Sequence, residues 1–185
     1  MKFLKHSNLE GKHAFLGASK FHWIRYSDEK IAEAYHKFCD IQKGTELHEL
    51  ASMLIRMNTK LPEEQKTLNM FVNDAIGFHM ESEQILLYSE NCFGTADAIC
   101  FRNDILRIHD LKTGETKTHM EQLMIYAALF CLEYKVKPGN IKIILRIYQN
   151  NDIWELEPQV DDILHFMDRI ITADKIISSL KEQEQ

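Results

Sequence analysis

The spacing of apolar residues predicts helices in the first part of the chain. Residues 29–40 place apolar side chains three and four positions apart behind Ser27 and Asp28, so we expect a helix with its N-cap there. The same spacing predicts a second helix over residues 45–57. A third helix should begin near Pro62, because proline suits a first helical turn.

After residue 77 the apolar period shortens to about two, which is typical of strands. Three alternating segments lie near residues 85–87, 96–100 and 105–109. Asn91, Gly94, Asn103 and Asp104 punctuate them. We therefore expect a three-stranded antiparallel meander.

Helical spacing returns over residues 119–134, where Thr118 is a candidate N-cap. Two further strands are expected over residues 141–148 and 153–157, and an amphipathic helix over residues 161–180. The helix at 119–134 can serve as a crossover, so the strand after it should lie parallel to one of the first three. The prediction is an α/β fold with a mixed five-stranded sheet flanked by helices on both faces.

Length and composition predict one domain. The chain has 185 residues, 45% apolar and 27% charged, enough to bury a core without disulfides. Within it we expect a helical N-terminal substructure (1–43), a catalytic core (44–157) and a C-terminal helix (158–185). No apolar run is long enough for a membrane span and the N-terminus is too polar for a secretory signal, so a cytoplasmic location is expected. The cysteines are too far apart for a zinc cluster and are expected to be reduced thiols: Cys39, Cys92, Cys100 and Cys131.

Charge is distributed unevenly along the chain. Residues 1–60 hold ten Lys or Arg against seven Asp or Glu, and residues 61–185 hold twelve against twenty-one. A polyanionic partner should therefore approach the surface built from the first third. Taken by itself, a split of this size is better explained by ordinary surface variation.

Two aspartates and a lysine carry the most informative chemistry. Asp110 and Lys112 are two apart near a strand end and leave the same sheet face, which Asp97 on the neighbouring strand can also reach. Two carboxylates suit Mg²⁺ or Mn²⁺, and the ammonium can orient a water or balance charge on a phosphate, so the trio predicts phosphodiester hydrolysis. The alternative is a solvated salt bridge, although strands disfavour aspartate. His109 should point away from Asp110 and be structural.

An imidazole from the N-terminal half could complete the metal ligands. Gly44 can end the preceding segment, and Thr45 can cap a helix whose first turn exposes His48. Taken alone, the spacing favours a surface or hydrogen-bonded role for His48 on that helix over a ligand role. Three glutamates rank below it as water-mediated ligands: Glu49, Glu81 and Glu83.

The four motifs together resemble a known family. Gly-Thr-x-x-His, Gly-Thr-x-Asp, Asp-x-Lys-Thr-Gly and Gln-x-x-x-Tyr-Ala occur in this order between residue 44 and about residue 134. In order and spacing they resemble the RecB-like branch of the PD-(D/E)XK nuclease superfamily, with Ala96 in place of the proline. The resemblance implies a restriction-endonuclease-like core and a metal-dependent nuclease that uses Mg²⁺ or Mn²⁺.

The resemblance also implies a role for each motif residue. The implied metal ligands are His48, Asp97, Asp110 and the backbone carbonyl of Leu111. Lys112 matches the catalytic lysine, and Gln122 and Tyr126 match helix residues that support the active centre or contact DNA. Some relatives bind an iron-sulfur cluster through three cysteines near the C-terminus. No cysteine follows Cys131, so that cluster is expected to be absent.

The N-terminal run of residues 13–20, followed by Trp23, is similar to the opening of phage-encoded members of this branch. Ser19 and Lys20 could bind a phosphate at a helix N-terminus, and Trp23 could stack on an exposed base. Trp23 is equally readable as an anchor of the N-terminal substructure. Thr113, next to the lysine, is a further candidate DNA contact.

The expected function is a metal-dependent deoxyribonuclease. An exonuclease acting on linear DNA ends is favoured because the chain has little length beyond the core for a base-reading module. We expect a homo-oligomer as a possible assembly, a single-strand annealing or binding protein as a possible partner, and a phage origin with a bacterial host cytoplasm as location. The alternatives are an inactive nucleic-acid-binding or regulatory protein on the same fold, and an RNA or CRISPR-adaptation-type end-trimming nuclease.

Overall fold

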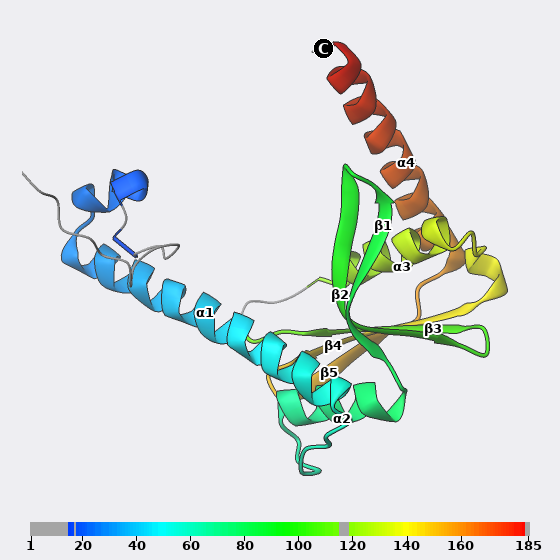
Figure 1. Ribbon diagram of the computed structural model, residues 1–185, viewed down its shortest axis with the longest axis horizontal. Coiled ribbons are helices and arrows are strands. Elements are labelled where there is room, and N and C mark those ends of the chain that lie inside the picture. Colours follow the sequence, from blue (N-terminus) through cyan, green and yellow to red (C-terminus); the bar gives the residue numbers. More distant parts are fainter. Residues whose placement is uncertain (1–14, 17, 115–118, 184–185) are drawn as a thin grey trace, which may run out of the picture. The chain divides into compact units, whose positions relative to one another are not determined.

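The computed structural model in Figure 1 describes residues 15–16, 18–114 and 119–183. The side chains of residues 18–21 also lie outside this description. The chain forms two compact units, residues 1–45 and residues 46–185. One long helix, α1 (Asp28–Arg56), runs through the division, so its residues 46–56 belong to the second unit.

The first unit holds the short 3₁₀ helix η2 (Ala18–Arg25) and the beginning of α1. Ser27 Oγ accepts a hydrogen bond from the backbone N–H of Lys30 at 3.3 Å, which confirms the predicted cap. Phe15 packs against Tyr35 and Phe38 with ring centroids 5.3 and 5.4 Å apart.

The two helices predicted over residues 29–40 and 45–57 are one helix of 29 residues. Gly44 does not end a segment, because a single glycine costs a helix only about 1 kcal/mol and no proline follows it. Thr45 is not a cap either. Its hydroxyl donates to the carbonyl of Ile41 at 3.2 Å, a bond that keeps threonine inside a helix. His48 consequently lies deep within α1, and not in a first turn as predicted.

The next helix, α2 (Thr67–Gly77), begins five residues later than predicted. The side chain of Asn73 bonds both the N–H and the carbonyl of Leu61, at 2.8 and 2.9 Å. These bonds hold the segment around Pro62 as a loop. The helix buries one apolar face, made of Phe71, Val72, Ala75 and Ile76.

The predicted mixed five-stranded sheet is confirmed, with strands in the order β1-β2-β3-β4-β5. All neighbours are antiparallel except β3 and β4, which are parallel and start with Ile105 opposite Lys142. The strands are β1 (Glu81–Ser89), β2 (Cys92–Arg102), β3 (Ile105–Leu111), β4 (Lys142–Gln149) and β5 (Asp152–Leu156). Gly94, predicted as punctuation, lies inside β2.

The crossover from β3 to β4 is α3 (Glu121–Glu133), and α4 (Val160–Gln183) ends the chain (Figure 1). Thr118, the predicted cap, lies outside the described residues. Where the chain turns from β4 into β5, Asn150 and Asn151 adopt φ values of 53° and 60°, which asparagine tolerates well.

Helices cover both faces of the sheet, as predicted. One apolar core packs α3 and α4 against the sheet, and another packs α2 and the end of α1 against the opposite face. This α/β arrangement agrees with a restriction-endonuclease-like core. All four cysteines are free thiols. Within the described part of the chain, no helix has the length and apolar character needed to cross a bilayer.

Candidate active site

The alternation of β2 breaks at Asp97, and this break directs the carboxylate. Ala96 packs in the α3 core and Ala98 in the α2 core, although residues two apart in a regular strand share one face. On β1, Gln84 pairs with Ala96 and Ser82 with Ala98. Glu83, which falls between them, has a φ of 54°. Local irregularities of this kind change the direction of side chains, and this one lies where Glu83 of β1 is opposite Asp97 of β2.

Three side chains from three elements meet at this break: His48 of α1, Glu83 of β1 and Asp97 of β2. One ligand atom of each lies within 4.8 Å of the others. His48 Nδ1 is 3.3 Å from Asp97 Oδ2, and the same oxygen accepts a hydrogen bond from the backbone N–H of Leu111 at 2.8 Å. The hydrogen bond to Asp97 raises the pKa of His48 against the opposing effect of burial.

Asp110 lies beside this group and is only 2% exposed. Burial, reinforced by the nearby Asp97 carboxylate, raises the pKa of Asp110 from an ordinary 3.8 to about 6. The Lys112 ammonium lies 3.1 Å from Oδ1, to which it donates a hydrogen bond, and 2.9 Å from Oδ2. Oδ2 is buried and accepts no well-oriented hydrogen bond from the described residues. The pKa of Asp110 therefore stays raised although a cation lies beside it.

A chain of hydrogen bonds from α3 holds Lys112. Its ammonium donates to Gln122 Oε1 at 3.0 Å, and Gln122 Nε2 donates to the Tyr126 hydroxyl at 3.1 Å. Tyr126 in turn lies against Gly94 so closely that a Cβ there would sit 2.8 Å from its Cε1 atom. The absence of a side chain at Gly94 is what lets the ring occupy this place.

The structure thus brings together most of the residues that the motifs predicted. We name them, with one addition, the carboxylate cluster: His48, Glu83, Asp97, Asp110 and Lys112. Gln122 and Tyr126 adjoin it. Leu111 takes part through its N–H, which donates to Asp97.

Four further candidates from the sequence are Thr113, Ser19, Lys20 and Trp23. Thr113 is exposed beside Lys112 and, with Lys66 and Thr67, lines a groove of about 420 Å³ that adjoins the cluster. Ser19, Lys20 and Trp23 belong to η2 in the first unit, where Trp23 is half-buried.

Glu83 is the addition, since the sequence ranked it with Glu49 and Glu81. Neither of those two, nor the predicted ligand Asp110, belongs to the group of converging ligand atoms found among the described residues. The pairing register of β1 and β2 places Glu83 opposite Asp97. A prediction of this register is the signal by which Glu83 could have been preferred to Glu49 and Glu81. The positive φ that turns it toward Asp97 has no signature in the sequence.

The chain matches no solved structure. A family model described as "Protein of unknown function (DUF2800)" matches residues 79–184. The matched segment contains Glu83, Asp97, Asp110 and Lys112, whereas His48 precedes it. Because the match covers more than half of the chain, the chain belongs to the DUF2800 family.

Proposed function

We propose that the protein is a metal-dependent deoxyribonuclease that hydrolyses phosphodiester bonds at DNA ends. The observation that carries the proposal is the carboxylate cluster, in which residues up to 64 positions apart gather around a buried aspartate with excess negative charge. The alternative, a salt bridge in which every carboxylate pairs with a cation, would leave no excess of negative charge.

The donor set fits a hard divalent cation. Asp97, Glu83 and His48, whose ligand atoms lie within 4.8 Å of one another, offer two carboxylates and an imidazole that Mg²⁺ or Mn²⁺ accepts, and Asp110 lies beside them. Asp110 is the strongest indication, because burial and the Asp97 carboxylate raise its pKa although the Lys112 ammonium lies 2.9 Å from Oδ2. A cation would favour the ionised form of Asp110, whose pKa is raised without one.

The chain's own residues supply the remaining chemistry. A divalent ion would polarise a phosphate oxygen and acidify the attacking water. Asp97 and Asp110 would hold that ion in place, and His48 would be fixed by its contact with Asp97. The Lys112 ammonium, held by Gln122, would lie where it can stabilise charge on the phosphate. The groove beside Lys112 and Thr113 gives a strand room to approach.

Action at DNA ends rests on the resemblance of the motifs to the RecB-like branch. The finer parts of the proposal are a homo-oligomer on DNA, an annealing or single-strand-binding partner, and a place in the cytoplasm of a phage-infected bacterium.

The test is cleavage of end-labelled linear DNA, covalently closed circular DNA and RNA by the purified chain with Mg²⁺, Mn²⁺ or EDTA. Lys112→Ala is the active-site variant. Lys142→Ala is its matched control, because Lys142 pairs with Glu157 at the far end of the parallel strand pair.

We expect shortening of linear DNA with either metal, none with EDTA, and loss of activity in Lys112→Ala alone. Equal nicking of circles would overturn the exonuclease assignment, and preference for RNA would overturn the choice of DNA. If Lys112→Ala cleaved as well as Lys142→Ala, the site itself would be misassigned.

A further inference from the structure

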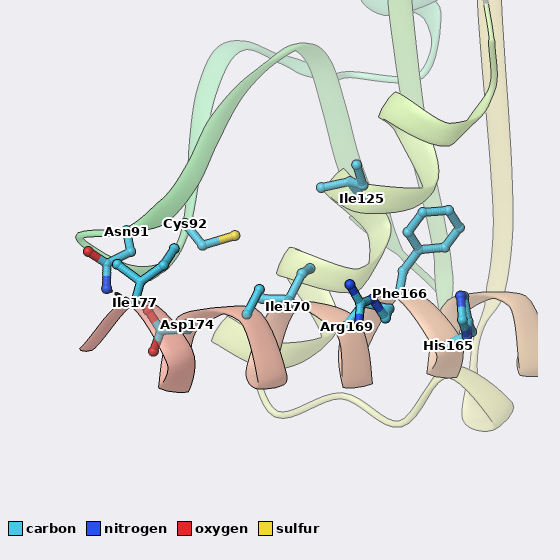
Figure 2. Close-up of a pocket in the computed structure, with 10 residues that line it drawn as sticks. Asn91, Cys92, Ile125, His165, Phe166, Arg169, Ile170, Asp174 and Ile177 are labelled. Carbon is cyan, nitrogen blue, oxygen red and sulfur yellow. Dashed lines mark hydrogen bonds between the residues drawn. The ribbon is translucent and has the colours of Figure 1, made fainter. Parts of the chain in front are cut away.

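The hairpin formed by β1 and β2 has one side that helices cover. Cys92 and Ala96 pack in the core that α3 and α4 form with the sheet, and Gly94 lies against Tyr126 of α3. Figure 2 shows the Cys92 side chain directed into the hollow that α3 and α4 line. The side chains that alternate with these residues must therefore point to the other side of the hairpin.

That other side carries large apolar side chains that remain exposed to solvent. Ile85 is 55% exposed, Leu87 46% and Phe93 61%. Leu87 pairs with Phe93 across the two strands, and Ile85 pairs with Thr95, which is also exposed. We call these four residues the hairpin face. Contiguous exposed apolar side chains are typical of binding surfaces.

The hairpin face continues directly into the carboxylate cluster. Phe93, Thr95 and Asp97 are two apart on β2 and point to one side of it. On β1, Glu83 of the cluster precedes Ile85 by two residues. Phe93 lies four residues from Asp97, which is about 13 Å along a strand and the axial length of about four stacked nucleotides. A nucleic acid with one phosphate at the cluster can therefore lay its next few nucleotides along the hairpin face.

The chemistry of the hairpin face suits the bases of a nucleic acid and not its phosphates. None of its four side chains carries a charge. A base is flat and apolar on both sides, so it stacks on an aromatic ring such as that of Phe93, whatever the sequence. In a duplex the bases stack on one another and the phosphates face outward. Only an unpaired strand can place its bases on this surface.

We propose that the hairpin face binds unpaired bases of the DNA strand whose phosphate lies at the carboxylate cluster, with Phe93 as the residue on which a base stacks. This inference rests on the proposed nuclease function and deepens it. It names single-stranded DNA, or the single-stranded end of a duplex, as the substrate.

The test measures DNA binding separately from cleavage. The probes are a fluorescent single strand of about 12 nucleotides, three times the length of the hairpin face, and a blunt duplex of the same sequence. Phosphorothioate linkages protect both from hydrolysis, so fluorescence anisotropy can be measured with Mg²⁺ present. Phe93→Ala is the variant of the face. Phe101→Ala is its matched control, because Phe101 is also an exposed β2 phenylalanine but packs against Phe130 of α3, with ring centroids 5.2 Å apart.

We expect the wild-type chain to bind the single strand more tightly than the blunt duplex. Phe93→Ala should weaken binding of the single strand about fivefold to tenfold, whereas Phe101→Ala should change it less than twofold and Phe93→Trp should retain it. A 2-aminopurine base in the strand loses fluorescence when it stacks. It should be quenched by the wild type and much less by Phe93→Ala. Unfolding midpoints verify that each variant is folded.

Several results would overturn the proposal. These are equal weakening by Phe93→Ala and Phe101→Ala, tighter binding of the blunt duplex, or binding of neither DNA. Self-association of the wild type that Phe93→Ala abolishes would identify a second copy as the occupant of the face.

Failure of the nuclease assignment would give a different result. Binding that depends on Phe93, without cleavage of unmodified DNA with either metal, would retain the hairpin face and overturn only the enzymatic activity. Cleavage of single strands that Phe93→Ala leaves unchanged would do the reverse.

Discussion

Strand β3 contributes residues to two polar clusters, one on each face of the sheet, that differ in how their charges are paired. Its neighbouring residues His109 and Asp110 are both buried, at 0% and 2% exposure, and point to opposite faces of the sheet. His109 belongs to a set of side chains on the α2 face that we call the His109 network: Asp74, His109, Arg146, Tyr148 and Glu155. Asp110 belongs to the carboxylate cluster.

The His109 network pairs its charged groups internally, although His109 Nε2 is buried and accepts no hydrogen bond from the described residues. The Tyr148 hydroxyl donates to Asp74 at 2.6 Å, so it accepts from His109 Nδ1, which lies at 3.1 Å. Arg146 binds both Asp74 and Glu155. Burial lowers the pKa of His109 to about 3, helped by Arg146 and Arg107, so the imidazole is neutral. As predicted from strand alternation, His109 points away from Asp110 and is structural.

The carboxylate cluster does the reverse. It sets three carboxylates, those of Asp110, Asp97 and Glu83, against Lys112 and the His48 imidazole, and burial raises the pKa of both Asp110 and Glu83. A network whose charges are paired stabilises a fold, whereas a cluster with unbalanced charge is a place where a ligand is expected. The comparison predicts that damage to the first costs stability and damage to the second costs activity.

The largest effect is expected from Asp97→Asn. The amide can still accept the N–H of Leu111, so the fold should be retained, but the charge that holds a cation is lost. We expect DNA cleavage to fall about 100-fold or more, with the free energy of unfolding little changed. Asp168→Asn, at an exposed position on α4, is the control. Equal activity of the two variants would contradict the role of Asp97.

Tyr148→Phe should have the next largest effect, and on stability only. It removes the hydroxyl that joins His109 to Asp74 and leaves both without that partner. We expect a loss of about 1 to 3 kcal/mol in urea unfolding, with cleavage by the folded enzyme nearly unchanged. Tyr134→Phe, at a residue 53% exposed, should cost almost nothing. A selective loss of activity in Tyr148→Phe would break the division between the two clusters.

A change of pH should alter the contributions of Asp110 and His109 to the free energy of unfolding in opposite directions. With a folded pKa of about 6 against 3.8 unfolded, Asp110 binds more protons in the folded state, so its contribution to stability falls as pH rises from 4 to 6. His109 has a folded pKa of about 3 against 6.5, so its contribution rises over the same range. Asp110→Asn should therefore gain on the wild type by up to about 1 kcal/mol per pH unit between pH 4 and 6 in EDTA.

Unfolding by urea at several pH values measures this difference. A constant gap between Asp110→Asn and the wild type would contradict the raised pKa. Added Mg²⁺ should stabilise the wild type at pH 7 and leave Asp110→Asn less affected, because the ion binds the ionised carboxylate.

Gly94→Ala should have the smallest effect. The new methyl group would meet the Tyr126 ring at 2.8 Å and displace it, and with it the Gln122 bond that holds Lys112. We expect about a fivefold loss of cleavage, equivalent to about 1 kcal/mol, the lower end of overpacking costs because Tyr126 is half-buried. Gly77→Ala is the control, because a methyl there meets nothing within 4 Å. Equal activity of the two would show that Tyr126 does not position Lys112.

Residue patterns predicted the sheet well because alternation and turn chemistry are local. The meander, the parallel β4 and the flanking helices followed from them. Helix boundaries failed where a side chain decided them: Thr45 bonds Ile41 within α1, and Asn73 holds Leu61 in a loop. Neither interaction has a distinctive sequence pattern.

The candidate site was predictable in its motif residues and not in its geometry. Asp110 and Lys112 share a face by simple alternation. His48 reaches Asp97 from one long helix, α1, where the apolar pattern predicted two shorter helices. Glu83 turns toward Asp97 because of a backbone irregularity. Positive φ at a non-glycine residue arises from tertiary context, which no local pattern encodes.

The central claim is that the carboxylate cluster holds a divalent ion, and a crystal of the chain soaked in Mn²⁺ tests it most directly. Anomalous scattering locates manganese without reference to any assumed site. The account predicts a peak bounded by His48, Asp97 and Asp110, with Glu83 near it, and no such peak in Asp97→Asn crystals. A peak confined to other residues, or none in the wild type, would contradict it.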